Sequence, residues 1–311
     1  MTSIAPAIVK LMEAHRDRRV SVQRCAEQVA RHLDTAGDTV GATAVREAAK
    51  KQPEPMAMAI ATGQVHGPVE WLQPMDLSND LVLDSATGAS LSRLADELAA
   101  APRIVAAGLD APTRAMLIGP SGTGKTMAVR WLGGRLGLPV ALVRLDRVAS
   151  SYMGETAKSL AKAFEDAASC PSIVFLDELD GMCSRRDRQT DVGEALRITS
   201  SLLQQLDLLP AVQIVIGATN FREAMDPALV RRLPSEVTFG LPDARARETM
   251  VRRWWERVPH DGDAVRAVVT ASAGRSGAET RALAMAAGRA AMLTNIPIEA
   301  SHVEAARKSA T

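Results

Sequence analysis

The segment GPSGTGKT, from Gly119 to Thr126, has the residue types and spacing of a phosphate-binding loop. Its glycines allow backbone N–H groups to approach phosphate oxygens, and a following helix would add the partial positive charge of its N-terminus. We expect the Lys125 ammonium to reach the outer phosphates and the Thr126 hydroxyl to hold Mg²⁺. The candidate ligand-binding positions are Gly119, Pro120, Ser121, Gly122, Thr123, Gly124, Lys125 and Thr126.

Two acids follow an apolar run in the segment IVFLDELD, residues 173–180. Ligands bind at the carboxyl ends of the strands in open parallel sheets, so a strand here would present both acids to a bound phosphate. Asp177 is a candidate Mg²⁺ ligand, directly or through water, and Glu178 is a candidate to polarise an attacking water. The alternative, a pair of acids in a solvated turn, is disfavoured by the phosphate loop.

The elements that must position these residues alternate between strand and helix. Short apolar runs predict strands at 115–119, 140–145, 173–177, 214–218 and 237–240. Such runs separated by helices indicate an α/β fold with a parallel sheet and helices on both faces, of the P-loop NTPase class. From Asp243 onward no strand is evident, and SGAE at 276–279 has the form of a helix capping box.

The same patterns suggest four parts of the chain. Residues 1–51 contain three amphipathic stretches and form an expected helical N-terminal module. Residues 52–75 are rich in proline and glycine and predict a linker or irregular segment. Residues 76–242 would form the α/β domain, and residues 243–311 a small helical domain.

Composition argues against several classes of protein. The chain has 311 residues, a formal net charge of +1 and a hydrophobic fraction of 47%. This balance indicates a globular chain without a positive field to attract nucleic acid. The three cysteines match no zinc spacing, no apolar run is as long as a membrane span, and the N-terminus has no signal-peptide core. We therefore expect a cytoplasmic protein with no membrane span and no nucleic-acid partner.

With these motifs in order, residues 76–307 resemble the classical branch of the AAA+ ATPases, which implies ATP and Mg²⁺ as ligands. In IVIGATN, Asn220 resembles the sensor residue that helps orient the water. MDPALVRRLPSEV resembles the segment that carries arginine fingers, so Arg231 or Arg232 would reach a neighbouring subunit's nucleotide. GRSGAET resembles the lid motif, which implies that Gly277 and Ala278 lie near adenine and ribose. The alternative for Asn220 is an ordinary asparagine in a turn after a strand, and the alternative for Arg231 and Arg232 is a solvated basic helix end.

The arginine-finger segment departs from the family pattern. Many classical members have a further arginine a few residues on, whereas RRLPSEV has none after Arg232. Glu236 stands near that position with the opposite charge. The resemblance therefore implies a second finger that is missing or supplied otherwise.

The single tyrosine lies in SSYMGETAKSL, ahead of a predicted helix containing Leu160 and Phe164. Tyr152, Met153 and Gly154 resemble the aromatic–hydrophobic–glycine loop that faces the central channel of AAA+ rings. An aromatic ring offers large contact area with few rotors, and glycine permits movement. The alternative is a hydrophobic staple, with Tyr152 or Met153 packed on the first turn of the helix.

Two functions follow from the resemblance. The first is a homo-oligomeric, hexameric ring that hydrolyses ATP and remodels or unfolds a client protein through its pore, with room for a separate effector such as a protease. The alternative is a nucleotide-dependent assembly switch that loads or activates another protein. The pore signature favours the first, and the lack of a basic stripe argues against a DNA-loading form of the second.

Overall fold

We describe a computed structural model of the chain, which defines residues 43, 65–66, 68–75, 81–145, 147, 156–183 and 192–309. The expected helical module at 1–51 lies outside these residues except for Thr43, which is helical. The candidate pore loop of Tyr152, Met153 and Gly154 also lies outside them. Both therefore stay predictions.

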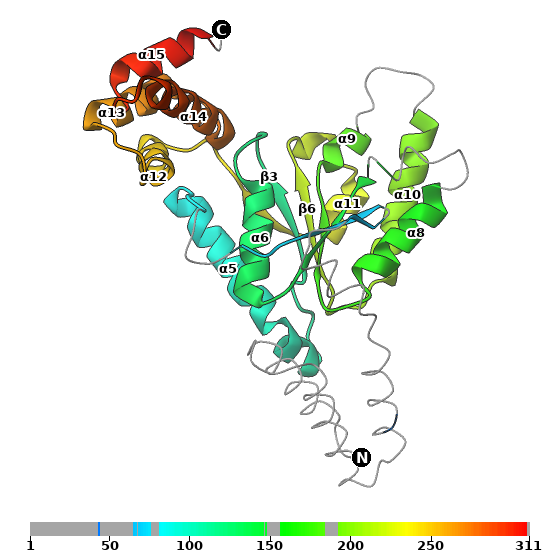
Figure 1. Cartoon of the computed structure of the whole chain (residues 1–311). Coiled ribbons are helices and arrows are strands. Elements are labelled where there is room, and N and C mark those ends of the chain that lie inside the picture. The colour runs from blue at the N-terminus through cyan, green and yellow to red at the C-terminus, as the bar shows by residue number, and fades with distance from the viewer. Residues whose placement is uncertain are drawn as a thin grey trace.

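Within the described residues, one seven-stranded sheet forms the centre of the molecule, in the order β1-β2-β4-β5-β6-β3-β7 (Figure 1). Antiparallel pairing joins β1 to β2 and β2 to β4, and the other neighbours are parallel. The strands are β1 (Val65–His66), β2 (Val69–Leu72), β3 (Arg114–Ile118), β4 (Val140–Val143), β5 (Ile173–Leu176), β6 (Ile214–Thr219) and β7 (Ser235–Thr238).

Strand β2 corrects the interpretation of residues 52–75 as a linker or irregular segment. Val69 and Trp71 are buried in the sheet core, and the strand pairs with β4 from Val69↔Val143 to Leu72↔Val140. The glycine and proline directly before it, Gly67 and Pro68, hid the strand from sequence reasoning, since these residues usually indicate a turn or loop.

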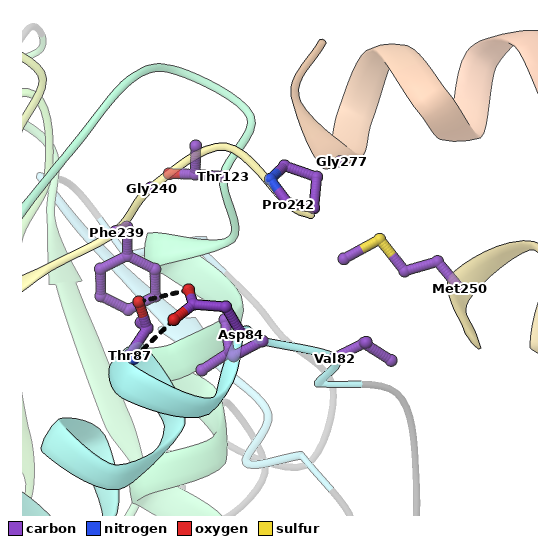
Figure 2. A pocket seen from close by; sticks show the side chains of 10 residues that line it. Val82, Asp84, Thr87, Thr123, Phe239, Gly240, Pro242, Met250 and Gly277 are labelled. Atoms are coloured by element: carbon purple, nitrogen blue, oxygen red, sulfur yellow. Dashed lines mark hydrogen bonds between the residues drawn. The ribbon is translucent and has the colours of Figure 1, made fainter. Parts of the chain in front are cut away.

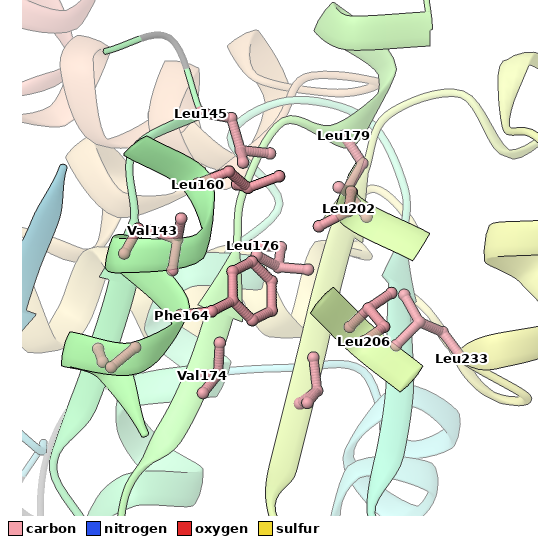
Figure 3. Close-up of a cluster of buried hydrophobic side chains, with 14 of the residues drawn as sticks. Val143, Leu145, Leu160, Phe164, Val174, Leu176, Leu179, Leu202, Leu206 and Leu233 are labelled. Carbon is pink, nitrogen blue, oxygen red and sulfur yellow. The ribbon is translucent and has the colours of Figure 1, made fainter. Parts of the chain in front are cut away.

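Helices cover both faces of the sheet (Figure 1). One face carries α5 (Ser85–Ala106) and α6 (Lys125–Leu136), and the other carries α8 (Thr156–Ala167), α10 (Val192–Leu208) and α11 (Pro227–Arg232). Alternate residues of each strand enter the two cores, as the two-residue period of a strand requires. In β5, Phe175 packs toward α5 and α6, whereas Val174 and Leu176 pack against Phe164 of α8 (Figure 3).

The C-terminal part is helical, as the sequence predicts. It comprises α12 (Ala244–Trp254), α13 (Gly262–Ala271), α14 (Gly277–Thr294) and α15 (Ala300–Ser309), which surround the buried Trp255. The predicted capping box is confirmed: the Ser276 hydroxyl accepts from the Glu279 N–H, and the Glu279 carboxylate accepts from the Ser276 N–H. We call α12–α15 the lid.

The predicted strands all occur, and their ends differ from the predicted ones by at most two residues. The helix expected around Leu160, Ala163, Phe164 and Ala167 is α8, and those four residues are its buried face. Sequence reasoning did not predict α5 or the short α9 (Leu179–Cys183) and η1 (Arg222–Ala224). Among the described residues, no helix combines the length and apolar character that a bilayer crossing needs.

Candidate functional site: a phosphate loop between the sheet and the lid

The predicted phosphate loop connects the end of β3 to the start of α6. Gly119 has a φ of 156°, and a Cβ there would lie 2.1 Å from the Phe239 carbonyl oxygen. Gly124, with a φ of 101°, precedes the first residue of α6, Lys125. The loop therefore places a helix N-terminus at the carboxyl ends of the strands, and glycine is required where the backbone passes Phe239, the residue after β7.

Lys125 is buried at the centre of the candidate site. Its Nζ donates to the carbonyl oxygens of Gly119 at 2.6 Å and Pro120 at 3.0 Å, and to Asn220 Oδ1 at 2.7 Å. Burial lowers the pKa of the ammonium group, while the nearby carboxylates of Asp177, Asp180 and Glu178 oppose this shift. The ammonium thus lies among oxygen atoms, where a phosphate would compete for it.

The two candidate metal ligands lie in contact. The Thr126 hydroxyl donates to Asp177 Oδ2 at 2.9 Å, so a hydroxyl and a carboxylate face the same point beside the phosphate loop. Mg²⁺ prefers such hard oxygen donors and usually completes its shell with water and phosphate. These two residues would hold the ion and leave positions open for the phosphates.

Glu178 is exposed and has a left-handed backbone, with a φ of 54°. A non-glycine residue in this region carries a conformational cost on the order of 1–3 kcal/mol, and such strain concentrates at functional sites. The Glu178 N–H donates to Asp177 Oδ1 at 2.9 Å, which fixes the turn after β5. The two acids therefore lie in different environments: Asp177 accepts a hydrogen bond from Thr126, whereas Glu178 is open to solvent.

Sheet topology brings Asn220 to the same place. β6 lies between β5 and β3, so the carboxyl ends of these three strands are adjacent. Asn220 follows β6 and accepts from Lys125, while its own N–H groups donate to Asp180. Residues that are far apart in sequence therefore meet around Lys125.

The lid contacts the phosphate loop directly. The Ala278 N–H donates to the Gly122 carbonyl oxygen at 3.1 Å. Gly122 has a φ of 75°, and a Cβ there would lie 2.8 Å from both Ala278 Cβ and Ser276 Oγ. The predicted lid residues Gly277 and Ala278 thus lie against the loop.

A pocket opens beside this contact, between α5, the strand end at Phe239 and the lid (Figure 2). Asp84 caps α5: it accepts from the N–H groups of Ala86 and Thr87 and from the Thr87 hydroxyl. Those hydrogen bonds lower the pKa of the Asp84 carboxyl group, and the bond from the Thr87 hydroxyl has the largest effect. The lining residues are Val82, Leu83, Asp84, Thr87, Thr123, Phe239, Gly240, Pro242, Met250 and Gly277.

Sequence reasoning missed most of this pocket. Gly277 and Thr123 were identified, whereas Val82, Leu83 and Met250 have no chemical signature that marks them. Asp84 could have been found as an N-cap, since an aspartate followed by a helix-forming segment is a helix-start signal.

The two candidate arginine fingers differ. Arg232 donates to Asp207 at the end of α10 through Nε at 2.7 Å and Nη2 at 2.6 Å, and to the Ala228 carbonyl oxygen at 3.3 Å. Arg231 is exposed and pairs with no carboxylate among the described residues. The structure therefore separates two arginines that the sequence left equivalent.

Glu236, the residue that departs from the family pattern, is bound within its own subunit. Arg222 Nε donates to Glu236 Oε1 at 3.0 Å and to Oε2 at 3.2 Å, and Arg222 Nη2 lies 2.9 Å from Oε1. The charge of this carboxylate is thus balanced by an ion pair with Arg222, the first residue of η1.

The segment from residue 115 to residue 241 matches the family described as "ATPase family associated with various cellular activities (AAA)". This segment is an AAA ATPase domain. The match includes the phosphate loop, the two acids, Asn220 and both candidate fingers, while the lid follows it.

Relatives of the AAA domain occur in several organisms. The chain is 35% identical over 191 residues to "Uncharacterized AAA family ATPase y4kL" of Sinorhizobium fredii. This alignment covers 61% of this chain and 58% of that protein. It is also 35% identical over 208 residues to "ATP-dependent zinc metalloprotease FtsH 4" of Sphaerobacter thermophilus. This alignment covers 64% of this chain and 32% of that protein. The chain thus matches less than two thirds of either relative.

Among solved structures, the crystal structure of the FIGL-1 AAA domain is similar, with a TM-score of 0.65 and 21% identity. The likeness covers 84% of this chain and 90% of that one, so it includes the lid. At this identity it establishes the fold, an α/β sheet flanked by helices with a C-terminal helical bundle.

Proposed function

We propose that the chain hydrolyses ATP with Mg²⁺ and uses the energy, as a homo-oligomeric ring, to remodel or unfold polypeptide. The observation that carries this proposal is the hydrogen bond from Ala278 of the lid to Gly122 of the phosphate loop. A nucleotide bound there touches two bodies at once, so its hydrolysis changes how they are held together. A mechanical ATPase needs that coupling.

In this proposal each site residue has one role in hydrolysis. Lys125 binds the outer phosphates, and Thr126 and Asp177 hold Mg²⁺. Glu178, exposed beside them, accepts a proton from the attacking water, and Asn220 orients that water. The apolar side chains of Val82, Leu83 and Met250 would contact the flat face of adenine beside Gly277, and Ala278 lies next to them against the phosphate loop.

Two kinds of relative support a polypeptide as the client. One is the ATP-dependent zinc metalloprotease FtsH 4 mentioned above. The other is "Putative 26S proteasome regulatory subunit homolog MTBMA_c13930" of Methanothermobacter marburgensis, 31% identical over 204 residues, which covers 64% of this chain and 55% of that protein. Both names associate a related ATPase with protein degradation. A separate protease is therefore a reasonable effector for this chain, and residues 1–51 would select the client or partner.

The decisive experiment compares clients. We expect the ATPase rate of the purified chain to rise with an unfolded protein and to be unchanged by DNA. Tyr152→Ala should keep basal hydrolysis and lose the unfolding of a fluorescent client, whereas Tyr152→Phe should retain much of it because ring area does the gripping.

Three results would contradict the proposal. Stimulation by DNA alone would support the assembly-switch alternative. Full client processing by Tyr152→Ala would remove the pore loop from the mechanism. A sharp loss of stability in that variant would instead place Tyr152 in a core, since truncating a buried aromatic residue costs about 3–5 kcal/mol.

A further inference from the structure

We propose that Asp180 is a positioning residue that fixes which end of the Asn220 amide faces the phosphate site. Asp180 is in α9, two residues beyond the candidate general base, and its carboxylate crosses to the end of β6. Oδ1 accepts from the Thr219 hydroxyl and the Asn220 backbone N–H, both at 3.0 Å, and Oδ2 accepts from Asn220 Nδ2 at 3.3 Å.

The orientation of the amide follows from its two neighbours. An ionised carboxylate can accept hydrogen bonds but cannot donate them, and an ammonium group can only donate. Asn220 lies between Asp180 and Lys125, whose Nζ is 2.7 Å from Oδ1. One orientation satisfies both contacts: the NH₂ group faces Asp180 and the carbonyl oxygen faces the phosphate loop.

The consequence concerns the reacting water. A carbonyl oxygen facing the site can accept an O–H from water, which directs the lone pair of that water elsewhere. A flipped amide would present N–H groups instead, which would compete with the water for phosphate oxygens. Because Thr219 is fully buried and also bonded to Asp180, the carboxylate has little freedom to release the amide.

This inference rests on the proposed role of Asn220 in hydrolysis, and it predicts a specific kinetic pattern. Asp180→Asn can offer an N–H to the amide, so the constraint from Asp180 is lost and only Lys125 still favours the present orientation. We expect kcat for ATP hydrolysis to fall roughly 10- to 100-fold, as expected for misplaced reacting groups, while the Kd for a fluorescent ATP analogue changes less than about twofold. Asp261→Asn, which removes the same charge at the N-cap of α13 in the lid, should change neither.

A double-mutant cycle with Asn220→Ala tests whether Asp180 acts through the amide. We expect Asp180→Asn to lower kcat in the wild type and to have no further effect in Asn220→Ala. If Asp180→Asn fails to fold in a melting experiment, Asp180→Glu, which keeps the acceptor on a longer arm, is put through the same cycle.

The outcomes separate this inference from the proposed function. If Asn220→Ala hydrolyses ATP at the wild-type rate, the role of Asn220 itself is wrong. If Asn220→Ala is slow but the Asp180 variant is not, or if the two losses multiply, Asp180 does not act through the amide. A parallel loss of nucleotide affinity and melting temperature would make Asp180 a structural residue.

Discussion

Arg232 and Asp207 form two parallel hydrogen bonds, at 2.7 and 2.6 Å, which join the end of α11 to the end of α10. This fork-to-carboxylate geometry is specific to arginine and directs the guanidinium group toward its own subunit. Arg231, one residue earlier, is exposed. The arrangement favours Arg231 as the residue that reaches a neighbouring nucleotide.

We therefore expect Arg231→Ala to bind ATP normally and to lose hydrolysis by as much as about a thousandfold, the scale of an arginine finger. Arg232→Ala should lose a smaller part of the hydrolysis rate. Mixing Arg231→Ala with Lys125→Ala subunits should restore part of the activity at mixed interfaces, measured as steady-state phosphate release. Full activity of Arg231→Ala at every protein concentration would argue against a shared site.

The same ion pair predicts a dependence of stability on pH. The hydrogen bond from Arg232 lowers the pKa of Asp207 from its usual 3.8. A carboxyl group whose folded pKa lies below the unfolded value stabilises the fold above the unfolded pKa, and this contribution disappears as pH falls through the folded pKa. Melting temperatures of wild type and Asp207→Asn should differ slightly and constantly between about pH 5 and 8 and converge in acid. A difference that grows in acid would contradict this account.

Glu178→Gln should keep nucleotide binding and lose roughly a hundredfold or more of the hydrolysis rate, because the amide cannot accept the proton of the water. Lys125→Ala should lose binding itself. Isothermal titration with ATP and a phosphate-release assay distinguish the two. Glu178→Gln should also trap ATP and client together, so a pull-down can identify the client. Wild-type hydrolysis by Glu178→Gln would overturn the assignment.

Replacing Thr126 by valine keeps its shape and removes its hydroxyl, which contacts Asp177. We expect the Mg²⁺ concentration for half-maximal hydrolysis to rise by roughly tenfold or more, and chelation of Mg²⁺ to abolish turnover in both proteins. An unchanged Mg²⁺ requirement would show that the hydroxyl is not a ligand.

Gly119→Ala should be destabilising, since its Cβ would lie 2.1 Å from the Phe239 carbonyl oxygen. We expect a loss of about 1–3 kcal/mol of unfolding free energy, together with nucleotide binding. Gly108→Ala is the matched control: its φ of 78° is also left-handed, but a Cβ there meets nothing within 4 Å. That variant should bind nucleotide normally. Equal effects of the two substitutions would point to backbone strain alone.

Local motifs were readable from the sequence because each needs only neighbouring residues. Within each of these motifs, the phosphate loop, the acids after β5 and the capping box of α14, the residues lie within a few positions of one another. Parallel strands then bring the loop, the acids and Asn220 to one edge. The sheet order that brings them together was not predicted, because it depends on long-range pairing.

Contacts between distant segments could not be read in this way. Arg232 and Asp207 are 25 positions apart, and their meeting depends on how α10 and α11 pack. The pocket draws Val82, Phe239 and Met250 from three separate segments, none with a local signal. The sequence shows Glu236 only as a reversed charge, and the fold adds its ion pair with Arg222.

The contact between Ala278 and Gly122 also has a mechanical consequence. It anchors one end of α14, an 18-residue helix, against the phosphate loop. Such a helix is about 27 Å long, so a lid rotation of about ten degrees around that anchor would move its far end by roughly 5 Å. The exposed side chains of Met292 and Leu293 are at that end. The helix would therefore act as a lever arm that converts a small rotation at the phosphate loop into a displacement of several ångströms at its far end.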